Sequence, residues 1–344
     1  MRTRFDIVIP TWNRRELLLQ SVASALAQTV PVRVCVVDNA STDGSADAVR
    51  ERFAGVEVHR CDEHRPYQQN LNRCVAVLQA EAGLILHDDD LVDPGYAEHV
   101  LGAFEAEPSA ALVIVGARPL QSADSRLRRV RIHPPFLWLR HAGAALREGR
   151  IVVPPGVLAE RLARGFRMNP YWPSVSYRRV AIQDRGFPTD LKTLLDYEAW
   201  MHVSARHAVV LSERTLCSNR FHGSMMTTRL LWPHTRSFEE DVLVITSRLE
   251  QTLGRPPGDD LRARMLSKVL YPTMLLGAAA RRAQYARYLA HSGYPFDRLL
   301  AEAEAELDEY WRFKGWRGPL ARAGWQLHRL GVRVSRGAQN VEAP

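Results

Sequence analysis

The sequence predicts an α/β fold: a doubly wound, mostly parallel β-sheet of Rossmann-like winding, followed by a helical C-terminal extension. In the first half, short β-rich runs alternate with stretches of helical character. The run Val32–Val37 is almost continuously apolar, which is typical of a strand buried on both faces of a parallel sheet. Strands separated by helices of this length are usually joined as parallel βαβ units.

The apolar pattern places the elements along the chain. We expect strands over Asp6–Ile9, Val32–Val37, Val56–Arg60, Leu84–His87, Ala111–Ala117 and Ala208–Leu211. We expect helices over Arg15–Gln28, Ser45–Phe53, Gln68–Ala80, Tyr96–Glu105 and Leu194–Arg206. The stretch from Arg118 to Pro173 is irregular and rich in Pro and Arg, so it predicts a variable loop or lid.

The C-terminal part has helical spacing throughout. Apolar side chains recur at helical intervals at Phe238, Val242, Ile245, Leu249 and Leu253. Similar repeats run over Phe296–Tyr310 and Trp316–Val334. The sequence therefore predicts an α/β domain over residues 1–230, divided into halves at 1–117 and 118–230, and a helical region over residues 231–344.

The composition is that of an ordinary globular protein. Of 344 residues, 46% are hydrophobic and 24% charged, with a formal net charge of +8. A basic excess suits nucleic acid, an anionic membrane or a phosphate-bearing substrate. The basic residues are scattered and no nucleic-acid-binding module is recognisable, so we expect no nucleic acid partner. The four cysteines lie far apart, which predicts free thiols and a reducing compartment.

The apolar segments also bear on localisation. The N-terminus lacks the apolar core of a signal peptide, and the longest apolar segment, Val269–Ala280, is too short to cross a bilayer. We therefore expect a cytoplasmic protein. In the C-terminal helices, aromatic residues such as Trp311 and Trp316 lie among arginines. Two alternatives stay open for this region: peripheral contact with the inner face of an anionic membrane, or packing against the α/β domain or a second subunit as a homodimer.

Polar residues follow three of the predicted strands. Pro10-Thr11-Trp12-Asn13-Arg14 follows the first strand, Asp38 to Ser45 follows the second, and Asp88-Asp89-Asp90 follows Leu84–His87. Ligands of an open parallel sheet bind beyond the carboxyl ends of its strands. The first two segments are also compatible with plain helix caps. Three adjacent carboxylates repel one another, however, and Mg²⁺ or Mn²⁺ relieves that repulsion through oxygen ligands.

Taken together, these segments resemble the family 2 glycosyltransferases with the GT-A fold. They read VIPTWNR, VVDNASTDGS and NLNRCVAVLQAEAGLILHDDDLVDPGY, and the resemblance covers the chain from Asp6 to about Thr228. It implies an inverting, metal-dependent enzyme that moves a sugar from a nucleotide diphosphate donor to a hydroxyl acceptor, which the sequence does not identify. The halves 1–117 and 118–230 are then the nucleotide-binding and acceptor-binding parts of a GT-A catalytic domain.

The resemblance also implies the residues that bind the nucleotide and the metal. Nucleotide contacts fall on Pro10, Thr11, Asn13, Asp38, Arg65 and Asp88. A carboxylate at Asp38 favours UDP or dTDP donors, whose pyrimidine N3–H is a hydrogen-bond donor. The metal ligand is Asp89, with Asp90 as a close second, and the ion is Mn²⁺ or Mg²⁺. His87 stands where many members of the family have Asp.

Two later segments complete the implied site. Asp196 is the general base by resemblance, and Glu198, two positions on, is the reserve. Arg220 and His222 approach the diphosphate, and His222 is also a candidate metal ligand. The Gln/Arg-Arg-Trp signature of processive synthases is absent, so we expect one sugar to be added per encounter.

Two other functions remain as alternatives. A nucleotidyltransferase acting on a sugar phosphate also uses carboxylates and a metal on a doubly wound sheet, but its first loop is usually glycine-rich, whereas PTWNR contains no glycine. A non-catalytic nucleotide-sugar-binding protein is the other alternative. It stays open because His87, and Leu195 in place of the acidic neighbour often found beside the general base, depart from the family pattern.

Overall fold

The structure is a computed structural model that describes residues 4–121, 149–164, 170–221 and 236–257, together with Leu261 and Met265. The chain divides into two compact units. The first comprises Met1–Phe238 with Glu250–Arg255, and the second comprises Glu239–Leu249 with Pro256–Pro344. The predicted site residues that the structure describes all lie in the first unit.

The N-terminal half of the first unit is a parallel sheet. Its strands are β1 (Phe5–Thr11), β2 (Arg33–Asp38), β3 (Glu57–Arg60) and β4 (Ala82–Ile85), arranged β3-β2-β1-β4. The register pairs Thr11 with Asp38 and Asp38 with Arg60, so these three residues lie side by side at the carboxyl edge. The strand expected at Val56–Arg60 is confirmed as β3. The parallel arrangement brings the polar residues at the ends of these strands together, as predicted.

The second half of the sheet mixes strand directions. β8 (Val175–Arg178) runs antiparallel to both β4 and β6 (Ala110–Gln121), and β6 pairs in parallel with β9 (Ala208–Phe221). β9 also pairs antiparallel with β5 (Leu91–Val92) and β7 (Arg150–Val153). The β6–β9 register shifts around Gly116, where an added Cβ would lie 2.7 Å from Thr215 Oγ1, so glycine allows this close approach.

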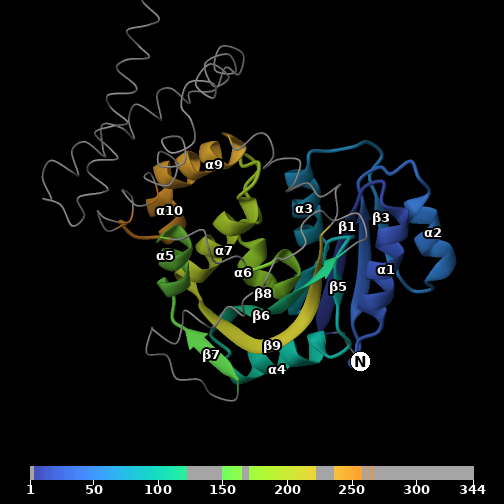
Figure 1. The fold of residues 1–344 in the computed structure, drawn as a ribbon, viewed down its shortest axis with the longest axis horizontal. Coiled ribbons are helices and arrows are strands. Elements are labelled where there is room, and N and C mark those ends of the chain that lie inside the picture. The colour runs from blue at the N-terminus through green and yellow to red at the C-terminus, as the bar shows by residue number, and fades with distance from the viewer. Residues whose placement is uncertain are drawn as a thin grey trace, which may run out of the picture. The chain divides into compact units, whose positions relative to one another are not determined.

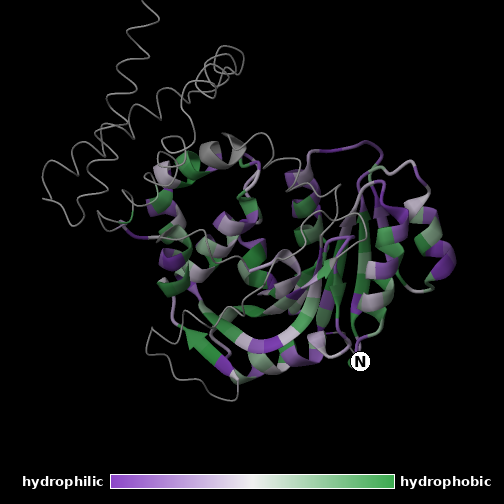
Figure 2. Cartoon of the chain, in the orientation of Figure 1, coloured by the Kyte–Doolittle hydropathy of each residue, from purple (hydrophilic) through white to green (hydrophobic). Residues whose placement is uncertain are grey.

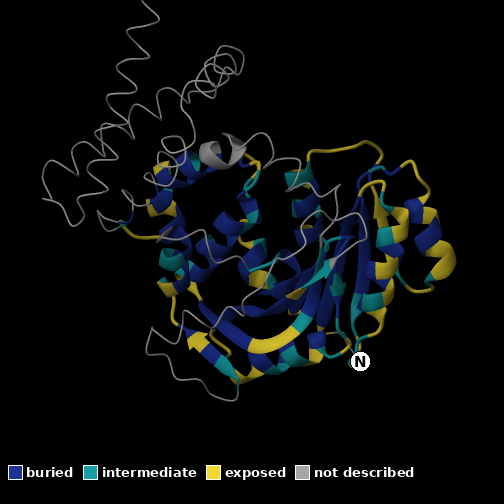
Figure 3. Cartoon of the chain, viewed as in Figure 1, coloured by how far each residue is buried: buried dark blue, intermediate teal, exposed yellow. Residues whose placement is uncertain are grey.

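Helices cover both faces of the parallel strands (Figure 1). On one face lie α1 (Arg15–Leu26), α2 (Ser45–Arg52) and α4 (Tyr96–Ala106), whose apolar side chains share a core with β1. On the other lie α3 (Tyr67–Ala76), α6 (Arg179–Gln183) and α7 (Leu195–Arg206). The strands between them are apolar and buried, as Figures 2 and 3 show.

Several element boundaries differ from the expectation for identifiable reasons. The helix expected over Gln68–Ala80 ends at Ala76, because Gln79 N and Ala80 N donate instead to the Asp6 carboxylate (2.6 and 2.9 Å). The strand expected over Ala208–Leu211 continues to Phe221, because it pairs with β6, β7 and β5 in turn.

The segment Arg118–Pro173 is not simply a loop, so this expectation was wrong for its described residues. β7 and α5 (Val157–Arg164) lie within it, and the short 3-10 turn η2 (Trp172–Ser174) closes it. α5 packs on α7, and its Leu158 and Leu162 are buried. Local composition did not reveal these elements because their apolar faces are matched by partners distant in sequence.

In the helical region that the sequence predicts, the structure describes α9 (Arg236–Ser247) and α10 (Leu249–Leu253). Val242, Ile245 and Leu249 are buried, as their spacing predicts. The repeats over Phe296–Tyr310 and Trp316–Val334 lie outside the described residues. Among the residues that were searched, no helix combines the length and apolar character that a membrane span requires.

Candidate functional site

The loops that follow β1 and β2 are fastened to each other at the carboxyl edge of the sheet. Asn13 Oδ1 accepts a hydrogen bond from Thr42 N (2.7 Å), and Asn13 N donates to Ser41 Oγ (2.9 Å). Asn13 (φ 52°) and Ala40 (φ 62°) both adopt left-handed backbone conformations, which cost about 1 kcal/mol or more in a non-glycine residue. Such strain is typical of loops whose shape serves a ligand.

Asp38 ends β2 with a fully buried side chain. Its Oδ1 accepts a hydrogen bond from Ser41 N (3.0 Å), whereas Oδ2 has no hydrogen-bond partner. Arg60 Nε lies 3.2 Å from Oδ2, and Arg60 Nη2 donates to Ser41 O (2.8 Å). A buried carboxylate oxygen without a hydrogen bond can accept one from a ligand.

A basic pocket of about 330 Å³ includes Arg60 in its wall. It is lined by Arg60, Cys61, Asp62, Arg65, Gln69 and Arg73. The loop that carries Arg65 is held by Asn39, whose side chain accepts from Arg65 N (3.0 Å) and donates to Arg65 O (2.8 Å). Three guanidinium groups make this pocket suitable for the carbonyl oxygens of a nucleobase or for an anion.

The carboxylates that follow β4 lie beside the loop after β1. Thr11 Oγ1 donates to Asp88 Oδ2 (2.8 Å). Arg14 Nη1 lies 3.1 Å from Asp88 Oδ1 and 2.6 Å from Asp89 Oδ2. Burial, followed by the negative charge of Asp89, raises the pKa of Asp88 to about 7. Two buried carboxylates thus share the positive charge of Arg14.

The end of β9 supports the same loop. Asp90 Oδ1 accepts hydrogen bonds from Asn219 Nδ2 (3.0 Å) and Arg220 N (2.9 Å), while Asp90 Oδ2 is buried without a hydrogen-bond partner. The Arg220 guanidinium donates to Asp89 O (2.9 Å) and Gln20 Oε1 (2.9 Å). In this structure Arg220 therefore holds the backbone that carries the carboxylates.

The residues of this loop fit a divalent cation. Ligand atoms of His87, Asp89 and Asp90 all lie within 4.8 Å of one another. Arg14 supplies one positive charge against three carboxylates, and Asp90 Oδ2 lacks a hydrogen bond. Oxygen-rich sites of this kind suit Mg²⁺ or Mn²⁺. The predicted ligand His222 lies outside the described residues.

His87 is held on two sides. Its Nε2 lies 2.8 Å from the Tyr67 hydroxyl, and its ring stacks on Trp172 with centroids 4.4 Å apart and planes at 21°. Trp172 is in turn fixed by a hydrogen bond from Nε1 to Ile85 O (2.8 Å). Burial lowers the pKa of His87 to about 4, so its imidazole is neutral at pH 7.

The start of α7 is tied to α3. Gln68 Nε2 donates to Leu191 O (2.6 Å), and the Asn72 side chain exchanges two hydrogen bonds with the backbone of Phe187 (both 2.8 Å). Gly186 (φ 74°) turns the chain directly against Asn72. These contacts hold the segment that leads into α7, whose first turn contains Asp196, against α3.

Tyr67 shows that Asp196 and the carboxylate loop face one region. Burial raises the pKa of Tyr67 well above its ordinary value, and the negative charges of Asp196 and Asp89 add to that rise. One phenol therefore lies within electrostatic reach of both groups. The partly buried Asp196 also accepts a hydrogen bond from Tyr197 N at Oδ1 (2.8 Å).

Glu198 has a different environment. Its side chain is fully buried, and Arg185 contacts both of its oxygens, with Nη1 2.8 Å from Oε1. Thr252 Oγ1 donates to Oε1 as well (3.0 Å). Three hydrogen bonds, two from a guanidinium, are typical of a structural carboxylate, which disfavours the reserve role for Glu198.

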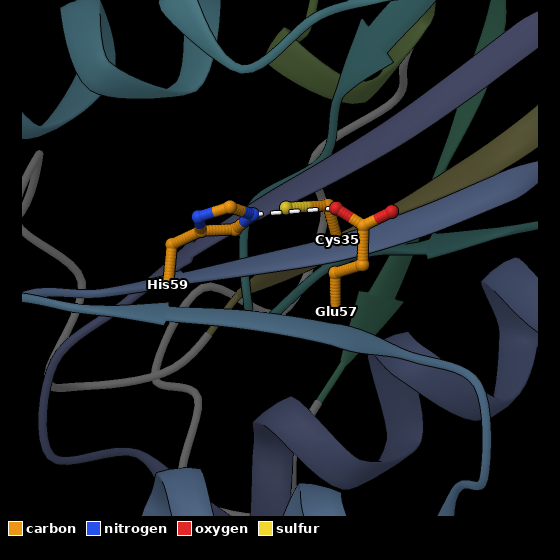
Figure 4. Close-up of side chains that lie close together, drawn as sticks. All are labelled: Cys35, Glu57 and His59. Carbon is orange, nitrogen blue, oxygen red and sulfur yellow. Dashed lines mark hydrogen bonds and ion pairs between the residues drawn. The ribbon is translucent and has the colours of Figure 1, made fainter.

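A second cluster, Cys35, Glu57 and His59, also brings three metal-ligating side chains together (Figure 4). Cys35 comes from β2, and the other two come from the edge strand β3. Burial raises the pKa of the Cys35 thiol to about 12, and Arg33 Nη1 already donates to Glu57 (2.9 Å). Because thiols bind metals as thiolates, this cluster is the weaker candidate.

The structure brings together Thr11, Asp88, Asp89, Asp90 and Arg220 through direct contacts, and Asp38 lies at the same edge. The sequence analysis missed the roles of Arg14, Asn39 and Tyr67. Arg14 and Asn39 lie inside segments already singled out, so their polarity was the available signal. Tyr67 gave none, because its importance depends on contacts across the fold.

The sequence was compared with protein families and curated proteins. The model described as "Glycosyl transferase family 2" matches residues 6–159. An uncharacterized protein of Mycobacterium tuberculosis (strain CDC 1551 / Oshkosh), MT1568, is 28% identical over 237 residues, which cover 66% of this chain and 70% of the relative. The succinoglycan biosynthesis protein ExoU of Rhizobium meliloti (strain 1021) is 33% identical over 92 residues, 26% of this chain and 27% of the relative.

Solved structures share the fold. S. aureus TarS 1–349 superposes with a TM-score of 0.63 at 16% identity, covering 98% of this chain and 92% of that chain. The same protein in complex with UDP-GlcNAc gives a TM-score of 0.61 at 15% identity, over 98% and 92% of the two chains. The mannosyltransferase PcManGT from Pyrobaculum calidifontis, in complex with GDP-Man and Mn²⁺, gives 0.52 at 15% identity over 99% and 89%.

Proposed function

We propose that this chain, which belongs to glycosyl transferase family 2, transfers a sugar with inversion from a nucleotide diphosphate donor to an acceptor hydroxyl, in a reaction that needs a divalent cation. One observation carries the proposal. The carboxylate loop, which fits a cation, contacts Tyr67 at the start of α3 through His87, and Asp196 lies in the first turn of the helix whose start is tied to α3 by Gln68. A direct displacement needs one group that stabilises the leaving diphosphate and another that acts as the base. The carboxylate loop and Asp196 are the respective candidates in this region.

The nucleotide end of the reaction is assigned to the loops after β1, β2 and β3. Asp38 Oδ2 is a buried acceptor for an N–H of the base, and Arg60 and Arg65 line the basic pocket that offers donors. Thr11 orients Asp88 toward the ribose. This arrangement fits the uracil or thymine of a UDP or dTDP donor, which presents one N–H between two carbonyl oxygens. The mannosyltransferase PcManGT, which shares the fold, was solved with GDP-Man. GDP-sugars should therefore be tested beside UDP- and dTDP-sugars.

The diphosphate end is assigned to Asp89, Asp90 and the residues that hold them. A divalent ion bound there supplies positive charge to the departing diphosphate. Arg220 keeps the loop in place through Asp89 O, and Arg14 lies beside the same carboxylates with a positive charge that attracts a phosphate oxygen.

Asp196 is assigned as the general base, which accepts the proton of the acceptor hydroxyl. An acceptor hydroxyl is a weak nucleophile at pH 7 and must lose its proton as it attacks the anomeric carbon. Asp196 takes that proton from the face opposite the leaving diphosphate, so no covalent sugar–enzyme intermediate is required. Leu195 and Tyr197, both buried, flank it and limit access of water.

The proposal is tested by incubating the protein and Mn²⁺ with UDP-, dTDP- and GDP-sugars and identifying the product. Release of a nucleoside diphosphate supports glycosyl transfer, and release of pyrophosphate from a nucleoside triphosphate and a sugar phosphate indicates nucleotidyl transfer. The anomeric configuration, followed by NMR, tests inversion. Binding of every donor without turnover in the presence of candidate acceptors and without donor hydrolysis identifies a binding protein instead.

The base assignment has its own variants. Asp196→Asn keeps the shape of the side chain and should lower turnover by about 10²- to 10⁴-fold, with nucleotide and metal affinity nearly unchanged. Asp184→Asn is the matched control, because Asp184 is a mostly exposed carboxylate that lies 3.7 Å from His202 of α7, the helix that contains Asp196. Normal turnover by Asp196→Asn, in a protein that otherwise transfers sugar, contradicts the role assigned to Asp196.

A further inference from the structure

We propose that His87 supplies a ring nitrogen to the divalent ion held by Asp89 and Asp90, which gives this site a higher preference for Mn²⁺ and Co²⁺ over Mg²⁺ than an all-oxygen site has. The inference rests on the proposed function, because it concerns the same metal site. It goes beyond that function because it assigns a ligand and a metal preference to the position where this chain departs from the acidic residue found in many relatives.

The first argument is geometric. The ligand atoms of His87, Asp89 and Asp90 lie within 4.8 Å of one another. In octahedral coordination with bonds of about 2.1 Å, ligand atoms are roughly 3.0 Å apart when adjacent and roughly 4.2 Å apart when opposite. The three side chains therefore fit around one ion with small adjustments, and Asp90 Oδ2, buried and lacking a hydrogen bond, is available to it.

The second argument is the way in which His87 is mounted. Ligating histidines usually engage their second ring nitrogen with a neighbouring group, which fixes the tautomer and the ring orientation. Here Nε2 meets the Tyr67 hydroxyl at 2.8 Å, and the ring is stacked on Trp172. When Nε2–H donates to the phenol oxygen, the lone pair lies on Nδ1.

The third argument concerns charge. An aspartate in place of His87 would add a fourth negative charge to a buried loop that already carries three carboxylates. A neutral imidazole contributes a lone pair without that repulsion. Nitrogen ligands favour later first-row metals over Mg²⁺, which demands oxygen ligands and retains its water. The preference should therefore rise from Mg²⁺ through Mn²⁺ to Co²⁺.

Pulsed electron paramagnetic resonance of the Mn²⁺-loaded full chain tests the assignment directly. We expect ¹⁴N modulation of the electron spin echo, which changes when histidine is labelled with ¹⁵N. The His87 contribution should disappear in His87→Asn and persist in His222→Asn. Modulation that is unchanged in His87→Asn, or a wild-type spectrum of bound Mn²⁺ without nitrogen coupling, overturns the inference and leaves the proposed glycosyl transfer standing.

A titration with Co²⁺ and Mg²⁺ tests the same inference with a second variant and a second measurement. In His87→Asp, which restores a carboxylate, the ratio of Co²⁺ to Mg²⁺ affinity should fall at least tenfold, about the effect of replacing one ligand or its support. An unchanged ratio in a variant with wild-type thermal unfolding means that His87 acts only through its stack on Trp172. Failure of the wild-type chain to bind any of the three ions overturns both this inference and the proposed metal dependence, whereas glycosyl transfer itself is judged by its products.

Discussion

The two ends of the parallel strands carry buried carboxylates in opposite situations. At the amino end, Asp6 accepts hydrogen bonds from Arg33 Nε and Nη2 (both 3.0 Å), from Gln79 N (2.6 Å) and from Ala80 N (2.9 Å). At the carboxyl end, Asp38 Oδ2 and Asp90 Oδ2 are equally buried and have no hydrogen-bond partner. The protein supplies hydrogen bonds to both oxygens of the first carboxylate but to only one oxygen of each of the others, although Arg60 lies 3.2 Å from Asp38 Oδ2.

The difference teaches how to tell a structural carboxylate from a functional one in this fold. Both kinds are buried aspartates on a strand of one sheet or in the loop after it, so neither residue type nor burial separates them. What separates them is whether donors from neighbouring elements have been provided, since a buried carboxylate without its partners is costly. Glu198, with Arg185 and Thr252, belongs with Asp6 by this criterion.

The largest expected effect comes from Asp89→Asn at the carboxyl end. Removing one negative ligand while keeping the shape should weaken Mn²⁺ binding and lower turnover more than 100-fold, because second-layer changes alone cost 10- to 100-fold. Asp90→Asn should have a smaller effect. Calorimetric titration with Mn²⁺ and a product assay measure both quantities, and excess chelator should abolish wild-type turnover. Full activity in chelator contradicts the metal assignment.

Asp6→Asn at the amino end should lower stability and leave metal binding unchanged. It breaks a buried ion pair with Arg33, so the free energy of unfolding should fall by about 3 kcal/mol in urea titrations, while Mn²⁺ affinity stays at the wild-type value. Asp90→Asn is the control, because its Oδ1 can still accept from Asn219 and Arg220 and the loss of one charge relieves repulsion, so its unfolding free energy should be unchanged or higher. If Asp6→Asn loses the metal and keeps its stability, the distinction between the two ends fails.

At the carboxyl end, Arg14→Gln tests whether a protein cation competes with a metal ion for the carboxylates. Arg14 is the cation that the chain places beside Asp88 and Asp89, so it competes with a metal ion for the same oxygens. Its loss should tighten Mn²⁺ binding in the absence of donor by roughly fivefold, corresponding to about 1 kcal/mol for a partly exposed pair. Arg15→Gln, an exposed neighbour, is the control. Weaker Mn²⁺ binding by Arg14→Gln would indicate that Arg14 orders the carboxylates instead.

The smallest effect concerns His99 on α4, away from both ends. Burial, and then the charges of Arg150 and Arg214, lower its pKa from 6.5 to about 4. Between these two pH values His99 is protonated in the unfolded chain and neutral in the folded chain. This contribution to stability is present above pH 6.5 and is lost as pH falls toward 4. Because His99 is only half buried, His99→Gln should reduce that loss by roughly 1 kcal/mol. Equal slopes of unfolding free energy against pH in both proteins contradict the assignment.

Much of the N-terminal half could be predicted from local sequence. The strands at Asp6–Ile9 and Val32–Val37 are apolar on both faces and need no distant partner to be recognised. The polar segments after them, including Asp38 and Asp88–Asp90, are contiguous in sequence, and parallel winding brings them to one edge. Prediction failed over Arg118–Pro173, because β7 and α5 depend on pairing with β9 and packing on α7.

The sequence by itself determined the match to the family 2 model over residues 6–159, the α/β order of elements and the residue types that meet at the carboxyl edge, because these depend on spacing and on chain direction. Only the tertiary structure decided which carboxylates are already satisfied. Asp6 and Glu198 receive their donors from Arg33 and Arg185, 27 and 13 positions away, and His87 receives its orientation from Tyr67 and Trp172. The physical reason is that the free energy of a buried polar group depends on its partners, and those partners are assembled only when the chain folds.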